Sequence, residues 1–333
     1  MPMIFKIRSN KIENKIKVDI KNIIRKYKYI KFEIELTKNL SIMEIEISIS
    51  LQKQSPAKVI ISIPDKREEI TGRYSICLNY WLPNCIEAVY RSQRSLTLKF
   101  DTDDYGNSNC LSMDSEDINN LIPDEYSMRN HYKQRYNNNP MPFHKFKKNW
   151  LERQHQVFWR GSTTGGGVLN TTKDLFKLKR VILCQLYNHN NSFNMKISKI
   201  VQNNLPKQIL IDELKKEKIW TRSVFENTFS KYCFYLDIPG NALAWGSIRK
   251  YLMGNLIFKS TTKRQLYYYR FLKPWTHYIP VDENFLDLDE KYSWVKSNME
   301  EAALIAWNGY IQANNYIKNT PEYLISRILE KTN

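Results

Sequence analysis

The chain has 333 residues, of which 42% are hydrophobic and 13% aromatic. These proportions exclude an intrinsically disordered protein, and the length predicts two domains of ordinary size, each with its own core. The formal net charge of +17 predicts an anionic partner, and nucleic acid, an acidic membrane surface and a phosphorylated small molecule are all compatible with it.

The five cysteines are scattered along the chain and include no CxxC pair. This pattern argues against a zinc site and against a disulfide framework, and it favours a reducing compartment. No segment approaches the roughly 20 apolar residues of a membrane span. The first residues also lack the apolar core of a signal peptide. We therefore expect a cytoplasmic protein.

The first 40 residues are strongly basic, with eleven Lys or Arg against four Asp or Glu. Between Ile12 and Tyr27, apolar residues recur at helical spacing with lysines between them. Such a helix can lie on anionic lipid. It can also pack its apolar stripe on its own domain while the lysines stay solvated. The two interpretations are compatible with each other.

Alternating apolar and polar residues follow this segment. The runs 30–36 and 43–51 are typical of two paired strands with one buried face, and 59–63 of a third strand. Residues 74–94 have a helical pattern that Pro83 interrupts, and a strand is expected over 96–100.

The next feature is an acidic cluster, DTDDYG, at 101–106. It is compatible with an ordinary turn, with a metal clamp made by Asp101 and Asp103, or with a general base at the end of a strand. A calcium loop is excluded, because its twelfth position is Ser112 and not the bidentate Glu that such loops need.

Residues 126–149 are rich in Tyr, Asn, Lys, Arg and His and contain two prolines. We expect this segment to connect two domains. The prediction is an N-terminal domain over residues 1–140, which includes the basic segment, and a C-terminal domain over residues 141–333.

From residue 157 on, short apolar strands alternate with helical segments, which indicates a parallel sheet covered on both faces. The expected strands cover 157–159, 195–201, 232–236 and 256–258. The expected helices cover 172–187, 220–229, 242–253 and 264–271, and the chain ends in helical segments over 298–317 and 321–329.

The stretch VFWRGSTTGGG at 157–167 joins the first of these strands to the first helix. It brings together an arginine, hydroxyl groups and glycines that expose backbone N–H groups. Donors and a cation at a strand end before a helix favour a site for a phosphate or another anion. A flexible glycine-rich linker is the alternative.

A second constellation follows the strand at 232–236. Asp237 and Asn241 are natural caps for the helix expected next, and Arg249 lies one turn beyond Trp245 on that helix. This geometry predicts that Arg249 points toward the glycine-rich loop, where it could grip a diphosphate. The alternative for Arg249 is a salt bridge on a solvated face.

Six motifs, taken together, carry a resemblance to glycosyltransferase family 90, which includes bacterial lipopolysaccharide and capsule glycosyltransferases and eukaryotic protein O-glucosyltransferases and xylosyltransferases. Their order and spacing match the family from about residue 95 to 300, whereas the first 90 residues carry no resemblance. The motifs are LIPD (121–124), FWRGSTTGG (158–166), LKR (178–180), LDIPGNALAW (236–245), FKS (258–260) and LKPWTHYIPV (272–281).

The resemblance implies an α/β, GT-B-like fold, in which two Rossmann-like domains face each other and a helical segment ends the chain. It also implies an inverting, metal-independent enzyme without a cofactor, whose co-substrate is a UDP-sugar held mainly by the C-terminal domain. The residues implied to bind the donor are Arg160, Gly161, Ser162, Thr163, Arg180, Asp237, Gly240, Ala244, Trp245 and Arg249.

The same resemblance implies a base in the acceptor-side N-terminal domain, among Asp101, Asp103 and Asp104. Asp104, which precedes Tyr105, matches the family best, although the cluster departs from the common form of the motif. We expect a glycosyltransferase that acts on a lipopolysaccharide, capsule or other glycan acceptor. It would be cytoplasmic or peripheral on the inner membrane, attracted there by residues 1–40. A basic nucleic-acid-binding protein and an inactive relative that acts as a binding module are the alternatives.

Overall fold

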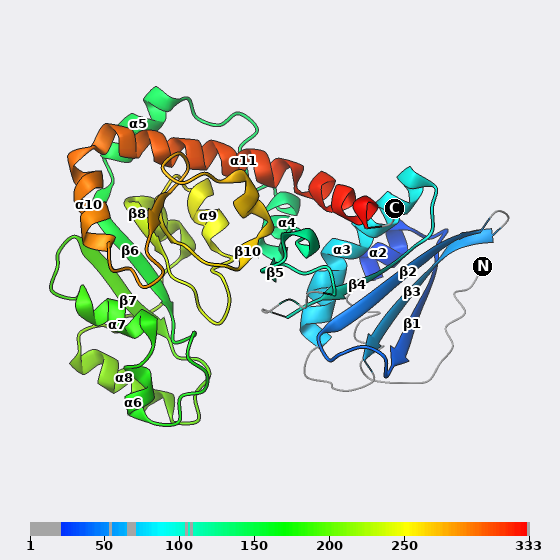
Figure 1. Ribbon diagram of the computed structural model, residues 1–333, viewed down its shortest axis with the longest axis horizontal. Coiled ribbons are helices and arrows are strands. Elements are labelled where there is room, and N and C mark those ends of the chain that lie inside the picture. Colours follow the sequence, from blue (N-terminus) through cyan, green and yellow to red (C-terminus); the bar gives the residue numbers. More distant parts are fainter. Residues whose placement is uncertain (1–20, 53–54, 65–70, 104–105, 107–108, 332–333) are drawn as a thin grey trace. The chain divides into compact units, whose positions relative to one another are not determined.

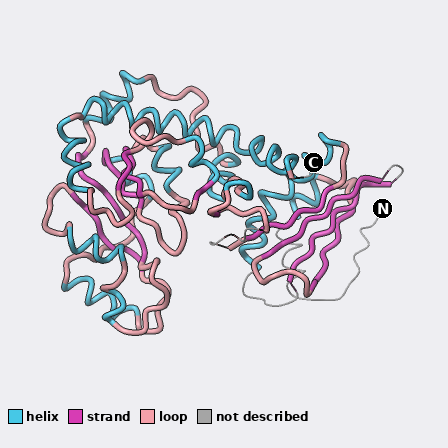
Figure 2. Tube along the Cα trace, in the orientation of Figure 1, coloured by secondary structure: helices cyan, strands magenta, loops and turns pink. Residues whose placement is uncertain are grey.

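The computed structural model describes residues 21–52, 55–64, 71–103, 106 and 109–331 (Figures 1 and 2). Contacts within the chain divide it into two compact units. The first comprises Met1–Gln134, Arg264–Tyr267 and Asn319–Asn333, and the second comprises Arg135–Lys263 and Tyr268–Lys318. The predicted division into domains at residue 140 stays a prediction.

A four-stranded sheet in the order β1-β3-β2-β4 forms the base of the first unit (Figure 1). Alternating isoleucines such as Ile47 and Ile61 are fully buried on one face of this sheet. Helix α3 (Thr71–Ser92) packs there, and its Trp81 stacks on Phe100 with ring centroids 4.9 Å apart. The strands are β1 (Lys31–Thr37), β2 (Glu44–Gln52), β3 (Ser55–Pro64) and β4 (Leu96–Asp101).

The predicted pairing of the first two strands is wrong, because β3 lies between them. β1 is parallel to β3, whereas β2 is antiparallel to both β3 and β4. Alternation of apolar and polar residues determines which face is buried but not which strand is the neighbour. The mixed sheet also differs from the parallel, Rossmann-like sheet expected in the N-terminal domain. Helix α3 continues through Pro83, where an interruption was expected.

Helix α2 (Lys21–Lys26) is the described part of the expected basic helix, whose earlier residues lie outside the described ranges. Ile23 and Ile24 are buried in it, while Arg25 and Lys26 are exposed. Within α2, the apolar side chains therefore pack on protein and the basic ones are solvated. Binding to lipid stays a prediction.

The first unit also contains four short elements: β5 (Asp114–Ser115), η2 (Ile118–Asn120), α4 (Glu125–Tyr132) and β10 (Gln265–Leu266). β5 and β10 pair as an antiparallel ribbon. Next to it, Arg264 Nε donates to the buried carboxylate of Asp114 at 2.5 Å. The helix predicted over 264–271 is therefore wrong at its start, because pairing with β5 draws residues 265–266 into a strand.

The second unit contains the predicted parallel sheet, which is confirmed. Its strand order is β11-β9-β8-β6-β7, and all four neighbouring pairs are parallel. The central strand β8 is buried along its whole length. The strands are β6 (Gln154–Ser162), β7 (Phe193–Lys199), β8 (Tyr232–Asp237), β9 (Leu256–Ser260) and β11 (Ile279–Val281).

Helical segments cover both faces of this sheet. On one face, Trp150 of α5 and Tyr292 of α10 pack edge-on against Phe234. On the other, Phe229 of η3 packs against Phe158 and Tyr235. The shorter helical segments of this unit are α5 (Phe143–Leu151), α6 (Thr172–Leu175), α7 (Lys179–Leu186), α8 (Lys207–Lys216), η3 (Glu226–Lys231), α9 (Ser247–Leu252), η4 (Tyr267–Phe271), whose first residue belongs to the first unit, and α10 (Leu288–Ser297).

Three predicted helices are corrected by tertiary contacts. The helix over 172–187 is split into α6 and α7, since both Leu175 and Leu178 turn into the core. The helix over 220–229 begins as extended chain, because Thr221 N–H donates to the carbonyl of Ile197 at the edge of the sheet, and only η3 follows. The helix over 242–253 is shortened to α9, with a turn before it in which Gly240 N–H donates to Ala242 O.

The chain closes with one helix, α11 (Met299–Glu330), where two segments were expected. Pro321 lies inside it without ending it. In the part of the chain that the structure describes, no helix is both long and apolar enough to cross a membrane.

Candidate active site

The carboxyl ends of β6 and β8 lie next to each other in the second unit. β6 pairs with β7 on one side and with β8 on the other, so the order of strands along the chain reverses between β6 and β8. Ligands of open α/β sheets bind at such a reversal, beyond the carboxyl ends of the strands. The glycine-rich loop after Ser162 and the loop after Asp237 therefore form the candidate site.

Arg180, the second residue of α7, joins these two loops. Its Nη1 donates to Thr164 Oγ1 at 2.6 Å and to Ser162 O at 3.2 Å. Its Nε donates to Pro239 O at 3.0 Å, and its Nη2 donates to Ile238 O at 2.9 Å. Burial lowers the pKa of the guanidinium. Arg180, which was expected to hold a phosphate, thus uses most of its N–H donors in hydrogen bonds to the two loops.

Glycine is required where the loops touch. A Cβ added to Gly240 would lie 2.6 Å from Thr164 Oγ1 and 2.9 Å from Arg180 Nη2. Gly165 has a φ of +100° and its N–H donates to Asn241 Oδ1 at 2.9 Å. The two loops form one interlocked unit, and side chains at these glycines would separate them.

Arg160 is directed away from the glycine-rich loop. Its Nη1 donates to Asn194 O and its Nη2 to Asn194 Oδ1, both at 2.6 Å, so the guanidinium is held against β7. It also lies over the Phe158 ring, 4.3 Å from the centroid, and burial lowers its pKa. After it, Gly161 leaves room for the Trp159 ring, which a Cβ would meet at 2.2 Å. Phosphate binding by Arg160 stays a prediction.

The hydroxyl groups of the loop divide into two kinds. Thr163 is fully buried, and its Oγ1 donates to Val201 O at 3.1 Å and accepts from Val201 N–H at 3.0 Å. This hydroxyl is occupied by the backbone of Val201, just beyond the end of β7. Ser162 Oγ and Thr164 Oγ1 lie 3.4 Å apart beside Arg180 and form the polar lining of the site.

Asp237 ends β8 and is only 4% exposed. Its Oδ1 accepts from Ser247 Oγ at 2.8 Å, which ties the strand to the first residue of α9. Burial raises the pKa of this carboxyl, and the charges of Lys259 and Arg180 oppose the shift. The predicted cap role is wrong, because the residue before α9 is Gly246, which makes no side-chain cap.

Arg249 forms a salt bridge, which the sequence analysis gave as the alternative to diphosphate binding. Its Nη1 donates to Glu226 Oε2 at 2.8 Å, while Lys250 and Arg135 lie 3.2 and 3.7 Å from the same carboxylate. Three cations therefore share the Glu226 carboxylate. Ala244 and Trp245 lie in the turn before α9, so Trp245 does not share a helical face with Arg249 as expected.

The acidic cluster lies in the first unit. Asp101 ends β4 and is 4% exposed, and its Oδ1 accepts from Asp103 N–H at 2.7 Å. Such a contact is typical of a turn. Asp104, the expected base, lies outside the described residues. Among those described, no three His, Cys, Asp or Glu side chains gather in a way that could hold a metal ion. The base and metal independence stay predictions.

Sequence reasoning missed three residues that the structure brings to the candidate site: Glu226, Ser247 and Lys259. Asn241 was expected to cap a helix, but it accepts from Gly165 N–H instead. Lys259 lies within a motif quoted above, but nothing in its local pattern distinguishes it. Glu226 and Ser247 act only through contacts made by folding.

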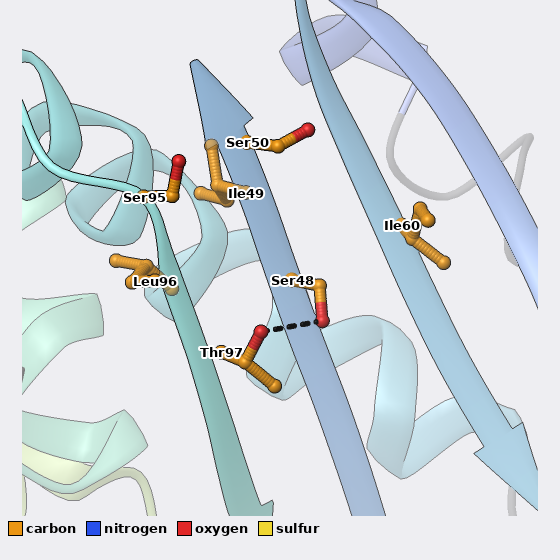
Figure 3. A pocket seen from close by; sticks show the side chains of 7 residues that line it. All are labelled: Ser48, Ile49, Ser50, Ile60, Ser95, Leu96 and Thr97. Carbon is orange, nitrogen blue, oxygen red and sulfur yellow. Dashed lines mark hydrogen bonds between the residues drawn. The ribbon is translucent and has the colours of Figure 1, made fainter.

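A cavity of about 260 Å³ lies elsewhere, on the sheet of the first unit (Figure 3). In its lining, the hydroxyl groups of Ser48 on β2 and Thr97 on β4 lie side by side, 3.0 Å apart. Its lining is Ser48, Ile49, Ser50, Ile60, Ser95, Leu96 and Thr97, none of which is charged. It is therefore poorly suited to a diphosphate.

Comparison with known proteins gives the site its context. Residues 133–327 match the sequence model of the family described as "Glycosyl transferase family 90". The match covers more than half of the chain. The chain belongs to glycosyltransferase family 90. The resemblance found in the motifs is thereby confirmed.

Among the family's curated members, the chain is 34% identical to protein O-glucosyltransferase 3 of Mus musculus over 104 residues, which are 31% of this chain and 21% of that protein. It is 34% identical to protein O-glucosyltransferase 1 of Rattus norvegicus over 79 residues, 24% of this chain and 20% of that protein. The matched region thus spans about a fifth of these relatives. A glycosyltransferase structure from Rickettsia africae ESF-5 overlaps at 10% identity with a TM-score of 0.34, over 98% of this chain and 82% of that chain. That score is too low to support an argument.

Proposed function

We propose that this protein is a glycosyltransferase that moves a hexose or pentose from a UDP-sugar to a hydroxyl group of a glycan acceptor. The observation that carries the proposal is the pair of interlocked loops at the reversal point between β6 and β8, joined by Arg180. Membership of glycosyltransferase family 90 supports the reaction class.

The diphosphate would bind at the glycine-rich loop, whose residues 165–168 are exposed. Backbone N–H groups there can donate to phosphate oxygens, and the cationic side chains of Arg249, Lys250 and Arg135 would attract them. These groups would stabilise the charge that grows on UDP as it departs, which is the task of a metal ion in other enzymes.

The reaction would be a single displacement with inversion. The acceptor oxygen forms its bond to the anomeric carbon as the bond from this carbon to the UDP oxygen breaks, and a carboxylate takes the proton of the acceptor hydroxyl. We assign the base to the cluster of Asp101, Asp103 and Asp104, with Asp104 as the first candidate. A GT-B-like arrangement of two domains belongs to the same proposal.

For the acceptor, we propose a lipopolysaccharide- or capsule-type glycan at the inner membrane face, where the basic residues 1–40 would attract the enzyme. The relatives are named protein O-glucosyltransferases. Hydroxyl groups of a protein are therefore the acceptor class to test beside the lipopolysaccharide- or capsule-type glycan.

The test is UDP release from a panel of UDP-sugars in the presence of EDTA. We expect slow turnover of one donor, with a loss of at least tenfold in both Arg249→Ala and Asp104→Asn. Arg222→Ala, at an exposed arginine, is the matched control and should retain the wild-type rate.

Other results would contradict parts of the proposal. A strict need for a divalent ion would reassign Asp101 and Asp103 to a metal clamp and remove the metal-independent mechanism. UDP binding without turnover would favour an inactive binding module. Failure to bind UDP, with salt-dependent binding to nucleic acid instead, would favour the nucleic-acid-binding alternative.

A further inference from the structure

Asp237 and Lys259 form a charged pair of residues on neighbouring strands. Asp237 is the last residue of β8 and Lys259 the second-last of β9, and the two are register partners in the parallel sheet. Register partners project to the same face, so both side chains lie at the carboxyl edge beside the loop that Arg180 anchors. Only 4% of Asp237 and 6% of Lys259 is exposed.

The ammonium group of Lys259 has few hydrogen-bond partners for a buried charge. Its Nζ lies 3.7 Å from the centroid of the Tyr269 ring and 5.8 Å from that of Tyr278. Its one hydrogen bond within the described ranges is to the carbonyl of Ser260, at 3.4 Å. An ammonium has three N–H donors, and burying them without acceptors is costly. Burial lowers the pKa of Lys259 to about 8.

A second buried donor belongs to the same group. Tyr251 of α9 is 1% exposed, and its hydroxyl has no hydrogen-bond partner in the described part of the chain. Burial raises the pKa of this phenol, and the charges of Asp237 and Tyr278 act in the same direction, which places it near both. Two buried donors, one of them charged, therefore lie around a carboxylate whose Oδ1 accepts from Ser247.

The combination of groups identifies the chemistry that would satisfy them. A phosphate has only acceptor oxygens, and the carboxylate of Asp237 would repel it. A sugar hydroxyl can donate to a carboxylate and accept from an ammonium at the same time, and the apolar face of a pyranose can pack on aromatic rings. The rings of Tyr269 and Tyr278 beside Lys259 supply such surfaces.

We propose that Asp237 and Lys259 bind hydroxyl groups of the transferred sugar and thereby determine which UDP-sugar is used. This inference rests on the proposed transferase function and adds the location of the sugar. The diphosphate would occupy the adjacent loop after β6, so the donor would extend along the carboxyl edge from β6 toward β9.

The experiment compares the dissociation constants of UDP and of the accepted UDP-sugar, measured by calorimetry. In Lys259→Met, we expect the affinity for UDP to stay within about twofold of wild type. The affinity for the UDP-sugar should fall about tenfold, which corresponds to the loss of one hydrogen bond to a charged group. Asp237→Asn should change the ranking among UDP-glucose, UDP-galactose and UDP-xylose. The matched control is Lys196→Met, which removes a lysine of β7 whose Nζ donates to Asn188 Oδ1 and Lys218 O. It should leave both dissociation constants unchanged.

A measurement on the wild-type protein covers the case in which a variant fails to fold. Affinity for the UDP-sugar should fall as the pH rises through about 8, where Lys259 loses its proton, whereas affinity for UDP should not. The groups that face Lys259 are Asp237, Tyr269 and Tyr278, and Tyr251 lies near Asp237. The pKa values of Tyr251 and Tyr278 are raised, so neither phenol ionises in this range.

Three outcomes would overturn the inference. An equal loss of UDP and UDP-sugar affinity in Lys259→Met would place the lysine at the diphosphate. Unchanged affinity for both UDP and the UDP-sugar, together with a lower melting temperature, would show that Lys259 has only a structural role. Both results keep the transferase function intact. Wild-type protein that neither binds UDP nor turns over a donor would overturn the proposed function together with this inference.

Discussion

The guanidinium of Arg180 donates to the hydroxyl of Thr164 at 2.6 Å, across the junction between the two loops of the candidate site. The same side chain donates to two carbonyls on the opposite loop. Because a planar guanidinium offers its donors in a fixed fork, this contact sets the distance between the two strand ends.

Arg180→Lys should therefore weaken both stability and donor binding. A lysine keeps the charge but cannot reach acceptors on both loops, so we expect a loss of about 2 kcal/mol in the free energy of unfolding and at least tenfold weaker UDP binding. Urea denaturation and calorimetry measure these effects. Arg222→Lys, at an exposed arginine, is the control. Unchanged UDP affinity in Arg180→Lys would show that the two loops keep their positions without the Arg180 guanidinium.

Gly240→Ala should separate the loops by steric force alone. The added Cβ would lie 2.6 Å from Thr164 Oγ1 and 2.9 Å from Arg180 Nη2, and overpacking of this kind costs about 1–3 kcal/mol. Gly246→Ala is the matched control, because its Cβ would have 3.6 Å to the nearest atom, Arg249 Nη2. We expect a lower melting temperature and weaker UDP binding only in the first variant. Equal behaviour of the two would contradict the close approach.

Glu226→Gln should destabilise the second unit. Its carboxylate accepts from Arg249 at 2.8 Å and from Lys250 at 3.2 Å, and the Lys250 side chain is only 8% exposed. Removing the charge leaves three cations close together, which we expect to cost about 2 kcal/mol at low salt and less at high salt. Urea denaturation at two ionic strengths measures this. Glu283→Gln, at an exposed position, should show neither effect.

The titration of Lys259 predicts how stability depends on pH. Its pKa is lowered from 10.5 to about 8 in the folded protein. Between these values the unfolded chain binds a proton that the folded chain has released, so the free energy of unfolding rises with pH, by up to about 3 kcal/mol. Wild type should gain stability relative to Lys259→Met between pH 8 and 10, whereas Lys263→Met, at an exposed lysine, should follow wild type. If the difference in the free energy of unfolding between wild type and Lys259→Met does not change with pH, the lowered pKa of Lys259 is contradicted.

The five cysteines should be unreactive in the folded protein. All are buried thiols, and burial raises the pKa of Cys110, Cys184 and Cys233 to about 12. The thiolate is the reactive form, so a thiol reagent at pH 8 should label none in native protein and all five after denaturation. A Lys263→Cys variant provides an exposed thiol as positive control. Rapid labelling of native wild type would contradict the buried positions.

Much of the second unit could be predicted from sequence. Continuous apolar runs such as 232–236 identified the strands of a parallel sheet, because both faces of such a strand are buried. The helices were less predictable. Residues 220–229 have a helical pattern, but their pairing with the edge of β7 involves residues far apart in the chain, and local periodicity carries no information on it.

For the site, the sequence determined the chemical types and their order: a glycine-rich loop after one buried strand, an aspartate after another, and arginines at 160, 180 and 249. The tertiary structure decided what each of them contacts. It turned Arg160 to β7, placed Arg180 between the loops, paired Arg249 with Glu226 and set Lys259 beside Asp237. The reason is physical: residue types and spacing follow from the local chain, whereas hydrogen-bond partners and burial depend on strand order and register, which arise only when the sheet assembles.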